Sequence, residues 1–508
     1  MTMTTPLPEK AGRPRISAGP GTSFLPRNTR FRPRSMGVML VGTALLIGTI
    51  VGFFLSPTAP IAGAWCIGMM LVLMFLGVPV AAALAIPSII GVYGLSGIPA
   101  TVNILATTPY TATAKWTYSV LPLFIFMGML LSQSGLTQKI YRATDRWFSW
   151  LPGGLAIGTT AAGAGLSSVS GSTIGMTYAL GRAAIPEMLR AGYDKRVALG
   201  SVIVAGLPGN LIPPSILLVV YAGIASVPVG PQLVAGAVPG LLVAVFVALF
   251  ILLLGIVSPK LVGRGGDRGP SATWAQRLSS LGEVWGFPVI LVVLFGGMFS
   301  GAFTPTEAGA AAALTALIIT LIEQRGSKPF ACVARAALAT VSASAAIFFI
   351  MIGAEMLTRL LAITGLAEIL TGFVTGLGLS RVGFLVVLIG VYLVMGMFFD
   401  TLAMMLLTVP ILLPAVEAMG VNALWFGVFV VLLGEIGMIT PPVGILSYIV
   451  HTIAKKPDVN LGTEITLGDV FRSLVWFLPI PLLFLVFMIA FPQVAEWLPG
   501  LLESAGGR

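Results

Sequence analysis

Long apolar blocks recur along almost the whole of this 508-residue sequence, and they constrain its fold more than any other feature. A helix of about 20 apolar residues matches the thickness of the hydrocarbon core of a bilayer. Only 9% of the residues are charged, against roughly a quarter in ordinary globular domains, and the mean hydropathy is +1.01. The sequence therefore predicts an all-α polytopic membrane protein.

Side chains suited to redox or metal chemistry are scarce in this sequence. The cysteines are Cys66 and Cys332 alone, which excludes a disulfide framework and a thiolate metal site. His451 is the single histidine, so a haem or zinc centre is not expected. The net charge of +10 comes from basic residues in short loops between apolar blocks, where they orient the chain in the membrane. We therefore expect no nucleic-acid partner.

The first 35 residues are polar and basic, with seven Lys or Arg against one acid, Glu9. This composition predicts a disordered cytoplasmic tail over 1–35, followed by a transmembrane helix over 36–57. The apolar segment begins too far from the start for a cleaved signal peptide. The N-terminus is therefore expected to lie in the cytoplasm.

Two stretches far apart in the sequence share an unusual pattern of helix breakers. "GLPGNLIPPSILLVVY" begins at Gly206 and "GEIGMITPPVGILSYI" begins at Gly434, a constant offset of 228 positions. Several Pro and Gly matches without a gap indicate an internal duplication. The same offset pairs Gly209 with Gly437, Pro213–Pro214 with Pro441–Pro442, Gly192 with Gly420, Pro186 with Pro414, Met176 with Met404 and Thr173 with Thr401.

The charges of equivalent loops show how the two copies are oriented. Residues 182–196 carry four Lys or Arg, whereas the equivalent residues 410–424 carry none. Loops rich in Lys and Arg stay in the cytoplasm, so the two equivalent loops are predicted on opposite sides of the membrane. The repeats are therefore predicted to be inverted.

The breakers and charges together predict the organisation of the chain, including a polar lateral segment over 98–116. Each repeat is expected to hold scaffold helices, a re-entrant hairpin and a broken transmembrane helix. The first repeat is 58–280, with hairpin 153–190 and broken helix 197–227; the second is 281–495, with hairpin 381–418 and broken helix 425–453; a C-terminal tail follows over 496–508.

The paired breaks indicate a binding site at mid-membrane. Proline within a helix costs about 3 kcal/mol, and unpaired backbone at membrane depth is tolerated only where it lines a cavity or is packed in protein. Gly and Pro are also simply more frequent in membrane helices. The repetition at one offset favours the functional interpretation, because matched broken helices in inverted halves are typical of transporter sites.

Each predicted hairpin tip carries polar side chains. Asp400 and Thr401 adjoin at the second tip, and an acid at membrane depth is a functional candidate. Hydroxyls also serve as contacts between helices, and Asp400 also fits a capping role at a helix start. At the first tip, five hydroxyl side chains surround Gly171: Ser167, Ser168, Ser170, Ser172 and Thr173.

The remaining acids have simpler structural interpretations. Glu307 follows a Thr-Pro turn and is expected near a helix start, while Glu355, Glu417 and Glu435 are interpreted as interfacial or packed. The first candidate site then has no ionisable group, and a proton relay requires groups that titrate. Oxygen ligands with one carboxylate suit Na⁺, so Na⁺ is the expected coupling ion.

Several motifs resemble the large membrane subunit of tripartite ATP-independent periplasmic (TRAP) transporters. They occur in order over roughly residues 60–490. The motifs are "FLGVPVAAALA" (75–85), "SGST…IPEMLRAGYDK" (170–195), "GLPGNLIPPSI" (206–216), "TPTEAGA" (304–310), "GMFFDTL" (396–402) and "EIGMITPPVG" (435–444).

The resemblance implies a permease subunit of a Na⁺-driven secondary importer in the bacterial inner membrane, and not an enzyme. It implies organic anions of the carboxylate class, such as dicarboxylates or sugar acids, and two or more Na⁺ ions. The implied partners are a small four-helix membrane subunit, a periplasmic substrate-binding protein and membrane lipids. The implied fold is similar to the ion-transporter superfamily, in which the hairpins and broken helices move as an elevator against the scaffold.

By motif, the resemblance places one Na⁺ site at Ser168, Ser170, Ser172, Thr173, Gly206 and Asn210, and a second at Asp400, Thr401, Gly434, Gly437 and Thr440. This sequence departs from the family pattern in two ways. The tail and the helix 36–57 are extra, and "GLPGN" brings an additional proline, Pro208, together with Asn210 where an apolar residue is more usual. Pro208 is expected to widen the first break.

Three other functions are alternatives to a TRAP permease. The nearest alternative is an ion-coupled anion transporter of the same superfamily that works without a binding protein. An intramembrane protease built on Ser170 and His451 is disfavoured, because the duplication predicts two equivalent sites and the first copy has no matching base. A passive channel would not require a pair of hairpins.

Overall fold

The computed structural model describes residues 34–263, 273–326 and 329–506, and the described chain is helical throughout, without a β-sheet. Most of the predicted basic tail, 1–33, lies outside the described residues. Seven described helices are long and apolar enough to cross a membrane, or eight if the bent pair Trp274–Glu283 and Gly286–Phe299 is counted as one span. The prediction of an all-α polytopic membrane protein is confirmed.

The described helices fall into two series that correspond to the two halves of the sequence. The first is α1 Arg34–Phe54, α2 Ala59–Phe75, α3 Val80–Thr113, α4 Val120–Gln133, α5 Leu136–Phe148, α6 Gly154–Ser170, α7 Thr173–Arg190, α8 Lys195–Val204, α9 Ile216–Ile224 and α10 Val229–Val257. The second is α11 Trp274–Glu283, α12 Gly286–Leu291, α13 Gly297–Phe299, α14 Pro305–Glu323, α15 Pro329–Thr364, α16 Leu366–Gly376, α17 Arg381–Gly396, α18 Thr401–Ala418, α19 Ala423–Ile439, α20 Ile445–Ala454, α21 Pro457–Asn460, α22 Leu467–Phe477, α23 Pro479–Ala490 and α24 Gln493–Gly506.

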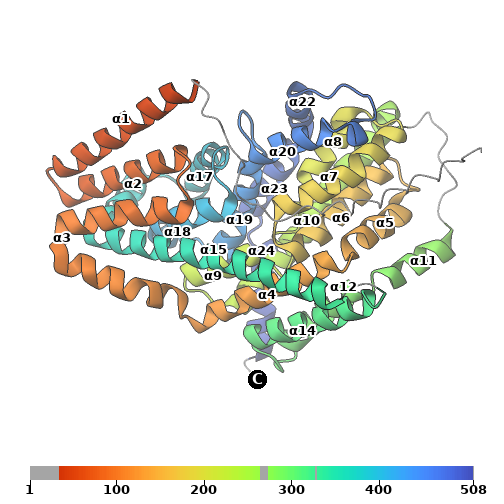
Figure 1. Cartoon of the computed structure of the whole chain (residues 1–508), viewed down its shortest axis with the longest axis horizontal. Helices are drawn as coiled ribbons and strands as arrows, with labels where there is room; N and C mark the ends of the chain where they lie inside the picture. The colour runs from red at the N-terminus through yellow and green to blue at the C-terminus, as the bar shows by residue number, and fades with distance from the viewer. Residues whose placement is uncertain (1–33, 264–272, 327–328, 507–508) are drawn as a thin grey trace, which may run out of the picture.

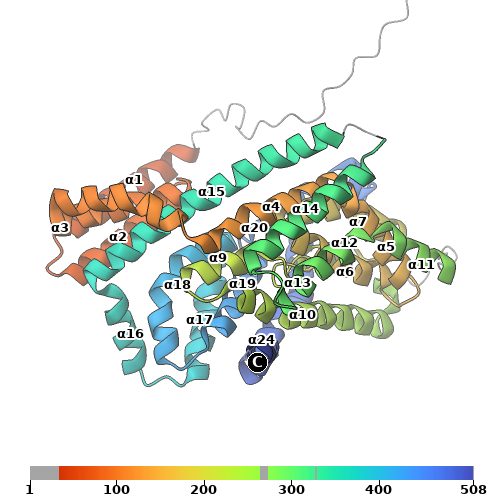
Figure 2. The ribbon, with the colours of Figure 1, turned by 90° about the horizontal axis from the view of Figure 1, so that it is seen from below.

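A frame of long helices lies along one side of the molecule. The 36-residue helix α15 runs beside α3 and α4, and α1 and α2 pack at the far end of α3 (Figures 1 and 2). The polar segment 98–116, expected as a lateral connection, is largely helical up to Thr113 and is separated from residues 80–96 of α3 by a kink. The direction changes at Gly97, whose φ of +75° is available to glycine at little cost.

Two helical hairpins approach the centre of the molecule from opposite sides. Hairpin α6–α7 turns at Gly171–Ser172, and hairpin α17–α18 turns over 397–400. The first lies on the right in both views and the second on the left, with α19 between them (Figures 1 and 2). This arrangement follows the order expected for inverted repeats.

Local backbone features recur at the offset of 228 positions. Ser172 caps α7 by accepting a hydrogen bond from the Gly175 amide, and Asp400 caps α18 by accepting one from the Ala403 amide. Both Pro213–Pro214 and Pro441–Pro442 peptide bonds are cis. Equivalent residues therefore perform equivalent local tasks in the two copies, and Asp400 is a helix cap.

The two breaks differ in length. The first separates α8 from α9 over 205–215, whereas the second separates α19 from α20 over only 440–444. Pro208 lies in the first break, and its missing N–H prevents α8 from continuing as α19 does. The expectation that Pro208 widens this break agrees with the structure.

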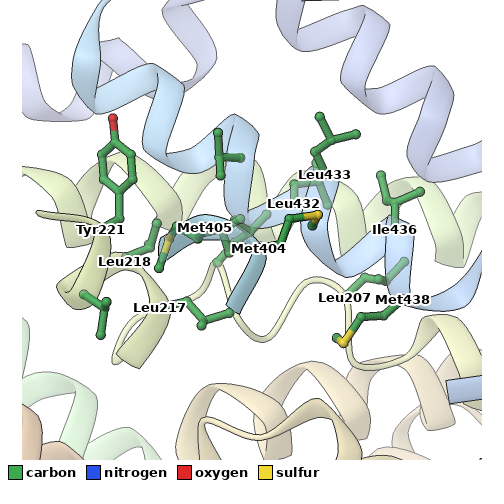
Figure 3. Close-up of a cluster of buried hydrophobic side chains, with 14 of the residues drawn as sticks. Leu207, Leu217, Leu218, Tyr221, Met404, Met405, Leu432, Leu433, Ile436 and Met438 are labelled. Atoms are coloured by element: carbon green, nitrogen blue, oxygen red, sulfur yellow. The ribbon is translucent and has the colours of Figure 1, made fainter. Parts of the chain in front are cut away.

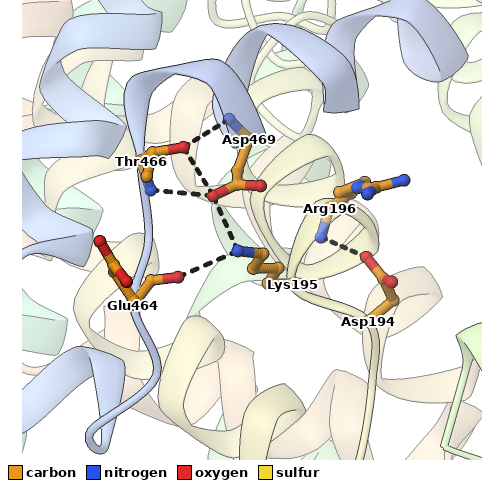
Figure 4. Close-up of polar contacts among 6 residues, drawn as sticks. All are labelled: Asp194, Lys195, Arg196, Glu464, Thr466 and Asp469. Carbon is orange, nitrogen blue, oxygen red and sulfur yellow. Dashed lines mark hydrogen bonds and ion pairs between the residues drawn. The ribbon is translucent and has the colours of Figure 1, made fainter.

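Polar contacts join the start of α8 to the second repeat. Lys195 donates to the carboxylate of Asp469 at 2.8 Å and to the Glu464 carbonyl at 3.0 Å, while Asp469 also accepts from Thr466 (Figure 4). The Asp469 side chain is only 6% exposed, so this ion pair is better shielded from solvent than a surface pair. The first broken helix is thereby fixed to α22.

The tail expected over 496–508 begins inside helix α24.

Candidate functional site

A single buried carboxylate connects all four elements that the repeats bring to the centre. Glu435, on α19, is 1% exposed. Oε2 of Glu435 accepts a hydrogen bond from the Thr173 hydroxyl at 2.7 Å. Oε1 accepts from the Asn210 amide at 2.8 Å and from the Thr401 hydroxyl at 3.0 Å. The donors come from hairpin α6–α7, the first break and hairpin α17–α18.

Asn210 extends this network within the first repeat. Its Nδ2 also donates to Oγ1 of Thr173 at 2.6 Å, and its Oδ1 accepts from the Ser167 hydroxyl at 3.2 Å. Because Asn210 is 3% exposed, an unpaired amide there would be costly. Every polar atom of the Asn210 side chain thus has a partner.

A cavity of about 290 Å³ opens beside this network. Two carboxylates, Asp400 and Glu435, line it together with hydroxyls and the Asn210 amide. Its described lining contains no Lys, Arg or His. The polar lining is therefore made of oxygen ligands with an acidic balance, which suits a hard monovalent or divalent cation.

Apolar side chains enclose the polar centre. Figure 3 shows Leu207 of the first break beside Met438 of α19, with Leu432, Leu433 and Ile436 above them. Leu207, Leu432, Leu433 and Ile436 are fully buried. These surroundings keep the local dielectric low and strengthen each hydrogen bond to Glu435.

Glycines allow the broken helices to approach the hairpins closely enough for these bonds. A Cβ on Gly206 would lie 2.8 Å from Cγ2 of Thr173, and one on Gly434 would lie 2.6 Å from Cγ2 of Thr401. Any larger residue at either position would displace the threonine that binds Glu435. The two contacts are equivalent at the offset of 228 positions, so the duplicated glycines have a steric explanation.

The structure brings together only part of the two predicted ion sites. Six of the predicted residues line the one central cavity: Ser170, Ser172, Thr173, Asn210, Asp400 and Thr401. Five do not line it: Ser168, Gly206, Gly434, Gly437 and Thr440. The Ser168 and Thr440 hydroxyls bond instead to carbonyls of their own helices, those of Gly165 and Ile436.

Of the two expectations for Glu435, interfacial or packed, the structure shows the packed one, and it adds a central hydrogen-bonding role that the sequence reasoning missed. The residue is buried and central, and its partners Thr401 and Thr173 lie 34 and 262 positions away in the sequence. One signal was present in the sequence, since an acid in the middle of an apolar segment is a functional candidate by default. Glu307, in contrast, lies at a helix start as expected, and there it forms a capping box with Thr304.

Comparisons with known proteins identify relatives of this chain. The C4-dicarboxylate TRAP transporter large permease protein DctM of Vibrio cholerae is 31% identical over 457 residues, which cover 86% of this chain and 96% of the relative. The ectoine TRAP transporter large permease protein TeaC of Halomonas elongata is 29% identical, covering 84% of this chain and 97% of the relative. These relatives are permeases, not enzymes.

Solved structures support the fold independently. The YdaH transporter of Alcanivorax borkumensis, described as having an unusual topology, superposes with a TM-score of 0.57 at 15% identity, covering 86% of this chain and all of the other.

The profile of the tripartite ATP-independent periplasmic transporter, DctM component, matches residues 67–494. The chain therefore belongs to the DctM family, the large membrane permeases of TRAP transporters.

Proposed function

We propose that this permease couples the inward movement of Na⁺ to the uptake of an organic anion of the carboxylate class. In a TRAP system the large permease works with a small membrane subunit and a periplasmic binding protein, which here would deliver the substrate from the periplasm of a bacterium. The relatives named above include a C4-dicarboxylate permease and an ectoine permease. Because they differ in substrate, we propose a class of substrate, the organic acids, and not a single compound.

One observation carries the proposal: both hairpin tips, the first break and helix α19 meet at one cavity, which Asp400 and Glu435 line and whose described lining has no basic side chain. An organic anion entering this cavity would meet two carboxylates. Bound Na⁺ ions would offset that charge, so ion and anion would bind favourably together and poorly alone. This mutual dependence is the basis of symport.

The transport step follows from the division of the molecule into frame and core. The hairpins and broken helices share the Glu435 network and the Lys195–Asp469 ion pair, so they would move as one body. Helices α3, α4 and α15 would form the stationary scaffold. Sliding of the core against the scaffold would expose the cavity to each side in turn, with the N-terminus in the cytoplasm.

Uptake into proteoliposomes tests the coupling ion. The chain is reconstituted with a small subunit and a periplasmic binding protein from the same organism, and uptake of that binding protein's ligand is measured under an inward Na⁺ gradient. We expect uptake to depend on Na⁺ and to continue when protonophore is added. Uptake that is equally fast with a proton gradient alone contradicts Na⁺ coupling. Uptake without the binding protein would favour the alternative transporter type.

A further inference from the structure

A second, larger cavity lies on the outer side of hairpin α6–α7. It has a volume of about 730 Å³ and is bounded by α5 on one side and by α6 and α7 on the other. The three helices lie side by side on the right of Figures 1 and 2. Its walls include Tyr141 and Arg142 of α5, and Tyr178, Ala179 and Arg182 of α7.

The charge of this cavity is opposite to that of the central one. Two guanidinium groups, Arg142 and Arg182, line it, and its described lining contains no Asp or Glu. The Lys456 ammonium adds a further positive charge at the rim, because it donates to the Tyr178 hydroxyl at 2.8 Å. Anions are therefore attracted to this cavity by three basic side chains.

The nearby acids leave much of this charge free. Arg182 binds Asp458 at 3.0 Å through one amino group, and Asp458 does not line the cavity. Arg142 has no ion pair within 4 Å among the described residues; the Glu283 carboxylate of α11 is bound to Arg146 at 2.7 Å and also interacts with the charge of Arg142 at longer range. A guanidinium without a carboxylate partner retains several donors for an oxyanion.

The equivalent face of the second hairpin shows that this basic lining is particular to one side. A cavity of about 210 Å³ lies against α18, where Leu406 and Pro410 occupy the positions equivalent to Tyr178 and Arg182. Its charged lining residues are one lysine and two glutamates: Lys115, Glu355 and Glu417. The paired arginines are thus not a general feature of the hairpin surfaces.

We propose that Arg142 and Arg182 form an anion-binding site between α5 and α7, which takes a carboxylate or phosphate group. Arginine presents a planar fork of donors that matches both groups. The anion has two possible sources. It is the organic anion that leaves the central cavity along hairpin α6–α7, a source that rests on the proposed function, or it is the headgroup of an anionic lipid.

Thiol labelling tests the site without transport. Ala179→Cys places a reactive group on the cavity wall, and the native Cys66 and Cys332 are 0% and 3% exposed, so their labelling is slow. We expect a negatively charged methanethiosulfonate to react faster than a positively charged one, by about fivefold relative to a neutral site. Arg142→Gln should remove most of this preference, and Arg142→Lys should restore it.

A matched control is available on the same helix. Arg190 of α7 is bound to Glu187 at 2.8 Å and does not line the cavity, so Arg190→Gln should leave the labelling preference unchanged. A preference that is the same in the Ala179→Cys chain with and without Arg142→Gln overturns the proposal, provided that Arg142→Lys labels normally and so shows an intact fold.

Protection experiments then identify the source of the anion. In nanodiscs of phosphatidylcholine, added sulfate should slow labelling by the anionic reagent if the site takes free anions. In nanodiscs that contain phosphatidylglycerol, slow labelling without sulfate assigns the site to a lipid headgroup. No protection in either case overturns the site. Because labelling requires no Na⁺ gradient, its failure is separate from a failure of Na⁺-coupled uptake.

Discussion

The two repeats share their backbone but not their chemistry. At the offset of 228 positions, helix caps, glycine contacts and cis prolines recur. The two threonines that bind Glu435 recur as well, but the carboxylate and the amide do not, because Glu435 corresponds to Leu207, and Asn210 corresponds to Met438. Each repeat therefore supplies one polar group where the other supplies an apolar one, and the two groups meet in one hydrogen bond.

After the duplication, the two copies kept the same backbone geometry but came to differ in their buried polar side chains. The geometry of a break and a hairpin depends on Gly and Pro, which act locally and in both copies alike. The hydrogen-bond network needs only one acid and one amide, since a second buried acid at Leu207 would add a charge that no described basic side chain of the central cavity compensates. The two repeats therefore have equivalent backbones, but the acid occurs in one repeat and the amide in the other.

The largest expected effect tests the shared backbone. A Cβ on Gly437 would lie 2.7 Å from Cα of Gly396, and the equivalent Gly209 is as tightly packed against hairpin α6–α7. Gly437→Leu should therefore destabilise the fold by about 3 kcal/mol or more, seen as loss of monodisperse protein in size-exclusion chromatography after mild heating. Gly390→Leu is the control, because Gly390 lies on α17, the helix that Gly437 contacts, but a Cβ there would meet no atom within 4 Å. Equal behaviour of the two variants would contradict the close-packing explanation.

The second prediction, with the next largest effect, concerns the carboxylate of Glu435, which has no polar counterpart in the first repeat. Glu435→Ala leaves the donors of Thr173, Asn210 and Thr401 without their acceptor, at about 1–3 kcal/mol for each buried group. We expect uptake to fall by about 100-fold, which corresponds to ~2.7 kcal/mol. Glu368→Ala, at an exposed acid of α16, should have no effect. Normal uptake by the Glu435 variant would refute the central role of this carboxylate.

The third prediction, with the smallest effect, separates the two roles of Asp400, as a helix cap and as a carboxylate in the cavity. Asp400→Ser gives the second hairpin the cap that the first has in Ser172, so α18 should still begin normally. The carboxylate is lost from the cavity, and the Na⁺ concentration for half-maximal uptake should rise about tenfold, or ~1.4 kcal/mol. Melting temperature in detergent provides the folding control. An unchanged Na⁺ dependence would leave Asp400 with the capping role alone.

Much of the fold could be predicted because its determinants are local. Hairpin 153–190 is observed as α6 and α7 over Gly154–Arg190, and the hairpin predicted over 381–418 is observed as α17 and α18. The Gly and Pro register marks the turns and breaks directly. The polar segment 98–116 is largely a helix of its own up to Thr113, set off from residues 80–96 by the kink at Gly97.

The site could be predicted only in part, because its contacts are not local. The tips and breaks contributed Ser170, Ser172, Thr173, Asn210, Asp400 and Thr401 to the cavity as foreseen. Their convergence on one carboxylate depends on how the two repeats pack, and no pattern within either repeat contains that information. Two separate sites were therefore expected where one shared cavity is found.

The network around Glu435 also sets the order in which this protein is completed. Thr173 and Asn210 are synthesised 262 and 225 positions before their shared partner. Within the first repeat these side chains bond one another, but their carboxylate acceptor is missing until α19 has been inserted. We therefore expect the first repeat to reach its final packing only after the second has joined it. Nascent chains arrested before residue 435 are expected to be protease-sensitive in hairpin α6–α7.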